Sequence, residues 1–256
     1  MTIVEAFILG VFQGITEFLP ISSSGHLVVI QEFLKINTPG VTFEVLLHFG
    51  SLVSVIIFFR KDIFHLITHP TDRFFWLIVV GIIPTGIIGV LFEDLFERLF
   101  GSITVVAIML LVTGLILWIA ETLASGKKDS ETMTIKDALI IGFAQGLAIT
   151  PGLSRSGSTI AAALIVGLDR DTAARYSFLV VIPVIFGATM LKVGDMFSTT
   201  SVDFFPIQYL VGTITAGITG YFAIAVLLKV LNTGRLKLFS IYCWTVGGLI
   251  LLTNLF

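Results

Sequence analysis

Six stretches of this sequence are apolar over close to the ~20 residues that an α-helix needs to cross the hydrocarbon core of a bilayer. They cover residues 43–59, 74–92, 102–120, 172–191, 207–228 and 238–255. The whole chain is 56% hydrophobic and only 12% charged, which excludes a disordered chain and a water-soluble enzyme. We therefore predict an all-α polytopic membrane protein that forms a single membrane domain over residues 1–256.

Two further apolar segments, residues 3–35 and 137–168, are each interrupted near the middle by a polar stretch containing glycine, proline and serine. The first break covers residues 17–26 and the second covers residues 151–159. The apolar pieces on either side are too short to span the membrane, which favours re-entrant half-helices. Backbone outside a helix is tolerated at this depth only where protein buries it or where it lines a wet cavity.

The two broken segments match each other at a constant spacing of 132 residues. This spacing relates Gly10, Gln13, Gly14, Ser22, Ser24 and Gly25 to Gly142, Gln145, Gly146, Ser154, Ser156 and Gly157. A fixed offset indicates an internal duplication, with repeats over 1–120 and 137–256 joined by a linker over 121–136. Each repeat then contains a re-entrant helix hairpin plus three transmembrane helices.

This architecture predicts inverted topology. A hairpin returns to its own side, so each half crosses the membrane an odd number of times and the second repeat is inverted relative to the first. If both hairpins instead span fully, the chain crosses ten times and the termini still share a side. The two breaks are expected to meet near the midplane.

The distribution of basic residues predicts the orientation. Of the 15 lysines and arginines, eleven fall on one side of this topology, while Lys35, Arg98 and Lys192 fall on the other and Arg155 lies in the second break. The positive-inside rule places the first side in the cytoplasm, so both termini and the mouth of the first hairpin face outward. We expect an acidic, solvated outer loop at residues 93–97.

Few ionisable side chains lie at membrane depth, and such residues indicate a functional site by default. Glu17, His26 and Arg155 belong to the breaks, so Glu17 and Arg155 come together if the breaks meet. A structural ion pair, with serines that only cap broken helices, is the alternative. Glu44 and His48 lie one turn apart nearer a helix end, which favours a local pair.

The hydroxyl groups at both breaks favour an anionic ligand. The half-helices are expected to begin near Gly25 and Gly157, and the hydroxyl side chains around these starts are Ser22, Ser23, Ser24, Ser154, Ser156, Ser158 and Thr159. Free backbone N–H groups and the positive end of the helix dipole bind anions at such starts. The fork of an arginine suits a phosphate group. The residues alone predict a membrane site for a phosphate-bearing ligand.

Both breaks resemble signatures of a known family. Residues 13–26 read Gln-Gly-Ile-Thr-Glu-Phe-Leu-Pro-Ile-Ser-Ser-Ser-Gly-His, and residues 151–159 read Pro-Gly-Leu-Ser-Arg-Ser-Gly-Ser-Thr. They are similar to the two motifs of the bacterial undecaprenyl-diphosphate phosphatase family, and the resemblance covers essentially the whole chain. Gln13 departs from it, since many relatives carry Glu there, and this leaves Glu17 as the main carboxylate.

The resemblance implies an enzyme of the bacterial plasma (inner) membrane associated with bacitracin resistance. Its reaction hydrolyses undecaprenyl diphosphate to undecaprenyl phosphate and inorganic phosphate, which recycles the lipid carrier for peptidoglycan synthesis. Because cell-wall polymerisation releases the diphosphate outside, we expect a site that faces the periplasmic or extracellular side. The resemblance also implies a divalent cation, Mg²⁺ or Ca²⁺, bound together with the substrate phosphates, and we expect Glu17 to hold it.

We expect Glu17, Ser23, His26 and Arg155 to carry the chemistry. Arg155 would stabilise the transferred phosphoryl group, and Ser23, to which the resemblance points, would be the nucleophile with Glu17 as its activator. His26 would act as a base, protonate the leaving group or orient the site. Direct attack by water stays open. The residues expected to bind phosphate or substrate are Gln13, Ser22, Ser24, Gly25, Ser154, Ser156, Gly157 and Thr159.

The expected partners are a polyprenyl diphosphate lipid and the bilayer itself. A net charge of −2 offers no basic surface for nucleic acid, and a homodimer is left open. The competing interpretation is a transporter or flippase for a lipid phosphate or a small anion, because inverted repeats with broken helices are typical of secondary transporters.

Overall fold

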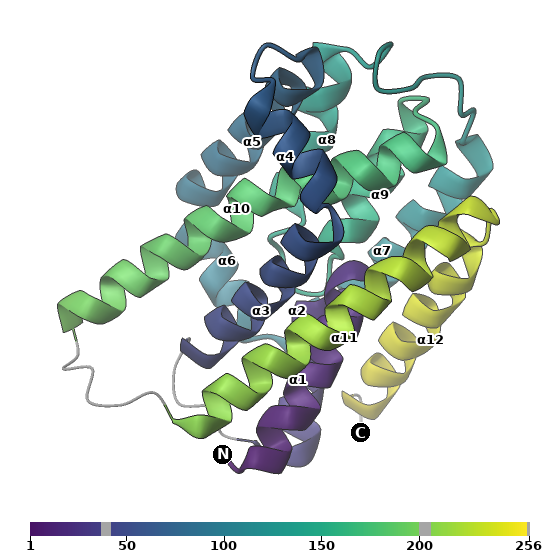
Figure 1. Ribbon diagram of the computed structural model, residues 1–256. Helices are drawn as coiled ribbons and strands as arrows, with labels where there is room; N and C mark the ends of the chain where they lie inside the picture. Colours follow the sequence, from purple (N-terminus) through teal and green to yellow (C-terminus); the bar gives the residue numbers. More distant parts are fainter. Residues whose placement is uncertain (37–41, 200–205, 255–256) are drawn as a thin grey trace.

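The computed structural model describes residues 1–36, 42–199 and 206–254, and within them the chain forms twelve α-helices and no strand (Figure 1). The first seven are α1 (Ile3–Phe18), α2 (Ser23–Leu34), α3 (Thr42–Phe58), α4 (Arg60–Thr68), α5 (Arg73–Leu91), α6 (Glu93–Phe100) and α7 (Ile103–Leu123). The other five are α8 (Ile135–Leu147), α9 (Arg155–Ile165), α10 (Arg170–Thr199), α11 (Ile207–Asn232) and α12 (Leu236–Asn254).

Five of these helices, α5, α7, α10, α11 and α12, are long and apolar enough to cross a membrane. A sixth span is formed if α3 and α4 are taken together, although they meet at an angle of 76°. The chain is therefore a multi-pass helical membrane protein, and the six predicted spans all coincide with helices.

Two short helices were missed by the sequence prediction. The acidic stretch expected to be a solvated loop is the helix α6, whose Phe96 is buried while its acidic side chains are exposed. Glu93 and Asp94 occupy its first turn, where negative charge interacts favourably with the helix dipole. The other missed helix, α4, carries Asp62 in its first turn and buries only Leu66. Both helices have too many charges to resemble a span.

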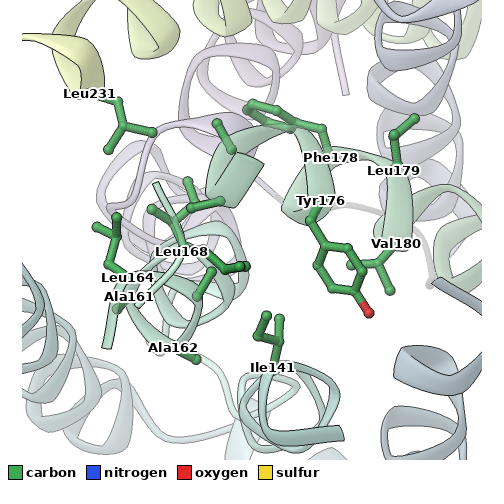
Figure 2. Close-up of a cluster of buried hydrophobic side chains, with 14 of the residues drawn as sticks. Ile141, Ala161, Ala162, Leu164, Leu168, Tyr176, Phe178, Leu179, Val180 and Leu231 are labelled. Carbon is green, nitrogen blue, oxygen red and sulfur yellow. The ribbon is translucent and has the colours of Figure 1, made fainter. Parts of the chain in front are cut away.

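The largest cluster of buried side chains lies around α8, α9 and α10 (Figure 2). Tyr176 of α10 is fully buried there, and its hydroxyl donates a 2.7 Å hydrogen bond to the carbonyl oxygen of Leu77 in α5. Ile141 of α8 and Leu164 of α9 pack in the same cluster. This core holds the second broken segment, α8–α9, firmly between long helices.

Glycines let the first helix of each broken segment approach a long helix backbone to backbone. In the contact between α1 and α11, a Cβ atom on Gly10 would lie only 2.5 Å from the carbonyl oxygen of Gly212. In the contact between α8 and α5, a Cβ atom on Gly142 would overlap the carbonyl oxygen of Gly81. Small residues at such crossings allow the dense packing that stabilises helices in lipid.

The two termini lie at one end of the molecule, and the connection between α7 and α8 lies at the other (Figure 1). This connection is fixed to the turn between α9 and α10. The Lys128 N–H donates to the Gly167 carbonyl oxygen over 2.9 Å, and the Asp169 N–H donates to the Lys128 carbonyl oxygen over 2.7 Å. The Lys128 ammonium also contacts Asp137, at 2.9 Å. The linker between the two halves is thus fixed to the second half at this end.

Candidate functional site

The first break separates α1 from α2. Pro20, which cannot continue a helix, follows Leu19 at the end of α1, and the chain turns through Ile21 before α2 begins. Ser22 is the N-cap of α2, and its Oγ accepts a hydrogen bond from the N–H of Gly25 at 3.3 Å. The half-helix therefore begins at Ser23, two residues before the predicted start.

The second break repeats this arrangement between α8 and α9. The chain turns at Pro151 and Gly152, and Gly152 has a φ of 87°, which favours glycine. Ser154 is the N-cap of α9, and its Oγ accepts a 3.1 Å hydrogen bond from the N–H of Gly157. The half-helix starts at Arg155, again two residues earlier than predicted.

The two breaks are in direct contact. The Oγ of Ser156 in the second break donates a 3.1 Å hydrogen bond to the carbonyl oxygen of Leu19 in the first. A Cβ atom on Gly157 would lie 3.2 Å from the Cβ atom of Pro20, so only glycine fits there without displacing its neighbour. The prediction that the two breaks meet is confirmed.

Glu17 is the point at which the site residues converge. Its carboxylate accepts a 2.5 Å hydrogen bond from Nη2 of Arg155 on one oxygen and a 2.6 Å hydrogen bond from Oγ of Ser23 on the other. The second oxygen also accepts from Nε2 of Gln13 at 3.0 Å and lies 3.4 Å from Nδ1 of His48. The side chain of Glu17 is only 5% exposed. The predicted meeting of Glu17 and Arg155 is confirmed, and each charge lowers the cost of burying the other.

Ser23 and Arg155 stand at equivalent places in the two breaks. Each is the first residue of its half-helix, and the two numbers differ by 132, the spacing found in the sequence. The two half-helices therefore point their first side chains at the same carboxylate, that of Glu17. One supplies a hydroxyl group and the other a guanidinium group, so the two related breaks have complementary chemistry.

Two buried polar atoms beside Glu17 have no hydrogen-bond partner. They are Nη1 of Arg155, a donor, and Oε1 of Gln13, an acceptor. An unpaired buried polar group costs free energy, about 1–3 kcal/mol in typical cases. A ligand would satisfy both atoms if it accepted a hydrogen bond from Nη1 of Arg155 and brought a cation or a hydrogen-bond donor to Oε1 of Gln13. A phosphate group with its counterion has this chemistry.

His26 lies at the first break, but its ring nitrogens contact groups other than the Glu17 carboxylate. Its Nδ1 is 2.7 Å from the carbonyl oxygen of Ser22, and its Nε2 is 2.7 Å from the hydroxyl of Tyr242 in α12. Its ring stacks on that of Tyr242, with centroids 5.6 Å apart and planes at 12°. Both ring nitrogens are thus occupied by groups other than Glu17 and Ser23.

The other predicted phosphate-binding serines divide into two pairs. Within the first break, Oγ of Ser22 lies 3.4 Å from Oγ of Ser24. Within the second, Oγ of Ser154 lies 3.3 Å from Oγ of Ser156. Ser24 is partly exposed, as is Ser23, whereas the other three are buried. Among these serines, the accessible ones therefore lie at the start of α2.

Thr159 is placed differently from the other predicted ligands. Its hydroxyl donates a 3.0 Å hydrogen bond to the carbonyl oxygen of Arg155, one turn earlier in α9. The same hydroxyl lies 2.5 Å from Oγ of Ser177 in α10. Thr159 thus braces the start of α9 against α10, and it supports the helix turn that carries Arg155.

The sequence prediction missed two residues of this region, His48 and Tyr242. His48 was paired with Glu44, but Glu44 accepts a 3.2 Å hydrogen bond from Gln31, and Nδ1 of His48 lies 2.9 Å from Nε2 of Gln13. The one available signal was that His48 is an ionisable residue within an apolar helix. Tyr242 gave no signal, because a tyrosine in a transmembrane helix is commonly a packing or interfacial residue.

The fold and the site define an integral membrane protein with a buried Glu17–Arg155 ion pair at which two helix starts meet. Residues 6–249 match the model of the family described as bacitracin resistance protein BacA. The chain belongs to this family.

Similar proteins match over nearly the full length of the chain. A protein from Halothermothrix orenii is 51% identical over 98% of both chains. A protein from Carboxydothermus hydrogenoformans is 45% identical over 96% of this chain and 95% of its own. A protein from Methanosphaera stadtmanae is 43% identical over 96% of both chains. All three carry the name undecaprenyl-diphosphatase.

Proposed function

We propose that this chain is an undecaprenyl-diphosphatase, which removes the terminal phosphate of undecaprenyl diphosphate and leaves undecaprenyl phosphate for reuse. Relatives up to 51% identical carry this name and match over nearly their whole length. The observation that carries the proposal is the convergence of Ser23 and Arg155 on Glu17. This arrangement brings together a hydroxyl nucleophile, a base and a cationic group that binds phosphate.

In the proposed reaction, Oγ of Ser23 attacks the terminal phosphorus atom. A bond forms between Oγ and phosphorus while the bond from phosphorus to the bridging oxygen breaks, and undecaprenyl phosphate leaves with that oxygen and its electron pair. The Oγ proton passes to Glu17 along the 2.6 Å hydrogen bond. Water then hydrolyses the phosphoserine, which releases inorganic phosphate and restores the serine. In the alternative, Glu17 activates water directly and Ser23 only binds phosphate.

The starts of α2 and α9 provide the proposed phosphate cradle. The N–H groups of the first two residues of each helix have no partner within the helix, and the third is already capped by a serine. The free N–H groups favour an anion, as does the unpartnered Nη1 of Arg155. The residues proposed to form or support this cradle are Gln13, Ser22, Ser24, Gly25, Ser154, Ser156, Gly157 and Thr159.

We further propose that a divalent cation, Mg²⁺ or Ca²⁺, binds together with the substrate phosphates. Among the described residues, no group of three His, Cys, Asp or Glu side chains is placed to hold a metal ion. Glu17 and Oε1 of Gln13 offer two oxygen donors, whereas these cations take about six or more. The donors fit a cation that draws most of its ligands from phosphate and water, and such a cation neutralises phosphate charge.

The first prediction concerns the activity itself. The purified protein in detergent should release inorganic phosphate from undecaprenyl diphosphate, and EDTA should stop the release by removing the cation. Glu17→Gln, which keeps the size of the side chain but loses its basicity, should be inactive. A transporter or flippase without hydrolytic activity would release no phosphate, and that result would contradict the proposal.

We also propose that the two halves are inverted repeats, each with one re-entrant hairpin. Two pairs of helix contacts support this proposal, because Gly142 follows Gly10 by 132 residues and Gly212 follows Gly81 by 131, close to the spacing that relates the breaks. Gly10 meets Gly212 where α1 crosses α11, and Gly142 meets Gly81 where α8 crosses α5. The termini and the connection between α7 and α8 lie at opposite ends of the molecule, which also fits an odd number of crossings in each half (Figure 1).

The positive-inside rule supports an orientation with the termini and the mouth of the first hairpin outside. A second prediction tests this orientation with the buried Cys243 replaced by serine. A cysteine at the exposed Arg98 of α6 should react with an impermeant thiol reagent in intact cells. A cysteine at the exposed Lys127, the matched control, should react only after lysis. The reverse labelling pattern would place the site on the cytoplasmic side.

A further inference from the structure

Ser22 adopts a backbone conformation that L-residues rarely use. Its φ is 69°, in the left-handed region, although it is not a glycine. Ser154, the N-cap at the equivalent place of the second break, has an ordinary φ of −70°. Strained residues persist only where neighbouring contacts fix them, and they gather at functional sites. The strain occurs in the first break, which presents Ser23 to Glu17, whereas Ser154 in the second break is unstrained.

The ring of His26 accounts for this difference between the breaks. The carbonyl oxygen of Ser22 accepts from the N–H of His26 at 3.2 Å and contacts Nδ1 of the same residue at 2.7 Å. At the equivalent place, the Ser154 carbonyl oxygen accepts from the N–H of Ser158 at 2.8 Å, and Ser158 has no ring to add a second bond. The left-handed Ser22 is therefore held by a side chain that its counterpart does not possess.

The ring of His26 is itself fixed by Tyr242. A carbonyl oxygen can only accept a hydrogen bond, so Nδ1 of His26 carries a proton. In a neutral ring, Nε2 is then an acceptor, and the Tyr242 hydroxyl donates to it over 2.7 Å. The stacking of the two rings adds a second constraint. The Ser22 carbonyl oxygen thus selects the Nδ1–H tautomer of His26, and Tyr242 fixes the orientation of its ring.

We propose that His26 and Tyr242 form a clamp that positions Ser23, and that His26 is a positioning residue in this site rather than its base. The inference rests on the proposed function. The clamp fixes the backbone of Ser22, and the direction of the next residue follows from that backbone. Ser23 is thereby held with its Oγ 2.6 Å from the Glu17 carboxylate. The last helix, α12, becomes part of the site through Tyr242.

Substitutions of His26 separate a positioning role from a proton-transfer role. In His26→Asn, the side-chain amide can take the place of Nδ1–H and donate to the Ser22 carbonyl oxygen, but it cannot exchange a proton with the substrate. We expect His26→Asn to keep kcat within about tenfold of wild type and His26→Ala to lose about 100-fold or more, with similar KM values in both. Equal inactivity of the two variants would overturn the proposal and indicate a base.

Tyr242→Phe removes only the hydroxyl group. In the wild-type background it should lower kcat about tenfold at unchanged KM, because the hydrogen bond that holds the His26 ring is lost. It should have no further effect in the His26→Asn background, because asparagine does not reach Tyr242. Tyr221→Phe, an equally accessible tyrosine of α11, is the matched control and should match wild type. Equal effects of Tyr242→Phe in both backgrounds, or no effect in either, would overturn the clamp.

A spectroscopic measurement tests the clamp independently of enzymatic turnover. The chain has four histidines, so the ¹⁵N signals of His26 can be assigned by their loss in His26→Asn. We expect the Nδ1–H tautomer in both the wild-type protein and Tyr242→Phe, with a shift of the Nε2 signal in Tyr242→Phe because the hydrogen bond from the Tyr242 hydroxyl is lost. If the wild-type protein released no phosphate, the proposed function would fail while this measurement still tested the clamp. An unchanged Nε2 signal in Tyr242→Phe would refute the hydrogen bond between Tyr242 and His26, and with it the clamp.

Discussion

Arg155→Lys is expected to lower kcat by about 10²–10³-fold while the protein still folds, the loss typical of removing one donor that stabilises charge in a transition state. Nη2 of Arg155 is bound to Glu17, and Nη1 is buried without a partner. The planar fork can therefore hold the carboxylate and a phosphate oxygen at once. The single nitrogen of lysine keeps the charge but can no longer bridge the two in the same geometry.

A matched control separates this effect from the general cost of replacing a paired arginine. Arg170 forms a two-nitrogen contact with Glu121, at 2.6 and 3.5 Å, on helices that do not contribute Glu17 or Ser23. Arg170→Lys should keep near-native turnover in the phosphate-release assay, even if thermal stability falls. Near-native turnover in Arg155→Lys would rule out the role assigned to Arg155.

The long helices could be predicted from sequence because membrane spanning sets both their length and their composition. The two short helices α4 and α6 could not, since each contains several charges and buries a single side chain. The starts of α2 and α9 lie two residues before the predicted positions, because each glycine is the third residue of its helix and the capping serine directly precedes the first.

Much of the site could also be predicted, because it lies in two motifs that repeat. Glu17 and Arg155 each stand in a polar break, and the proposed duplication would bring such breaks together. His48 could not be assigned, because its partner Gln13 lies on another helix, and helical spacing favoured the nearby Glu44. Tyr242 meets His26 across 216 residues, and no local pattern encodes a contact of that kind.

Ser23→Ala is expected to reduce turnover by about 10⁴-fold or more while leaving the fold and lipid binding largely intact, since losing the nucleophile of a hydrolase has effects of this size. The Ser23 hydroxyl is bound to Glu17 at 2.6 Å, and Ser23 is partly exposed at the start of α2. Ser54→Ala, a buried serine of α3 bonded to its own helix, is the matched control and should keep its activity.

Loss of activity alone would not distinguish a nucleophile from a phosphate ligand. The covalent mechanism predicts a phosphoserine at Ser23 when the reaction is quenched with acid during turnover, detectable by mass spectrometry and missing in Ser23→Ala. Direct attack by water predicts no such adduct. In that case Glu17, already 2.6 Å from the hydroxyl, would activate a water molecule beside Ser23. A wild-type rate in Ser23→Ala would eliminate both roles for the hydroxyl, because neither attack nor phosphate binding through it would then be needed.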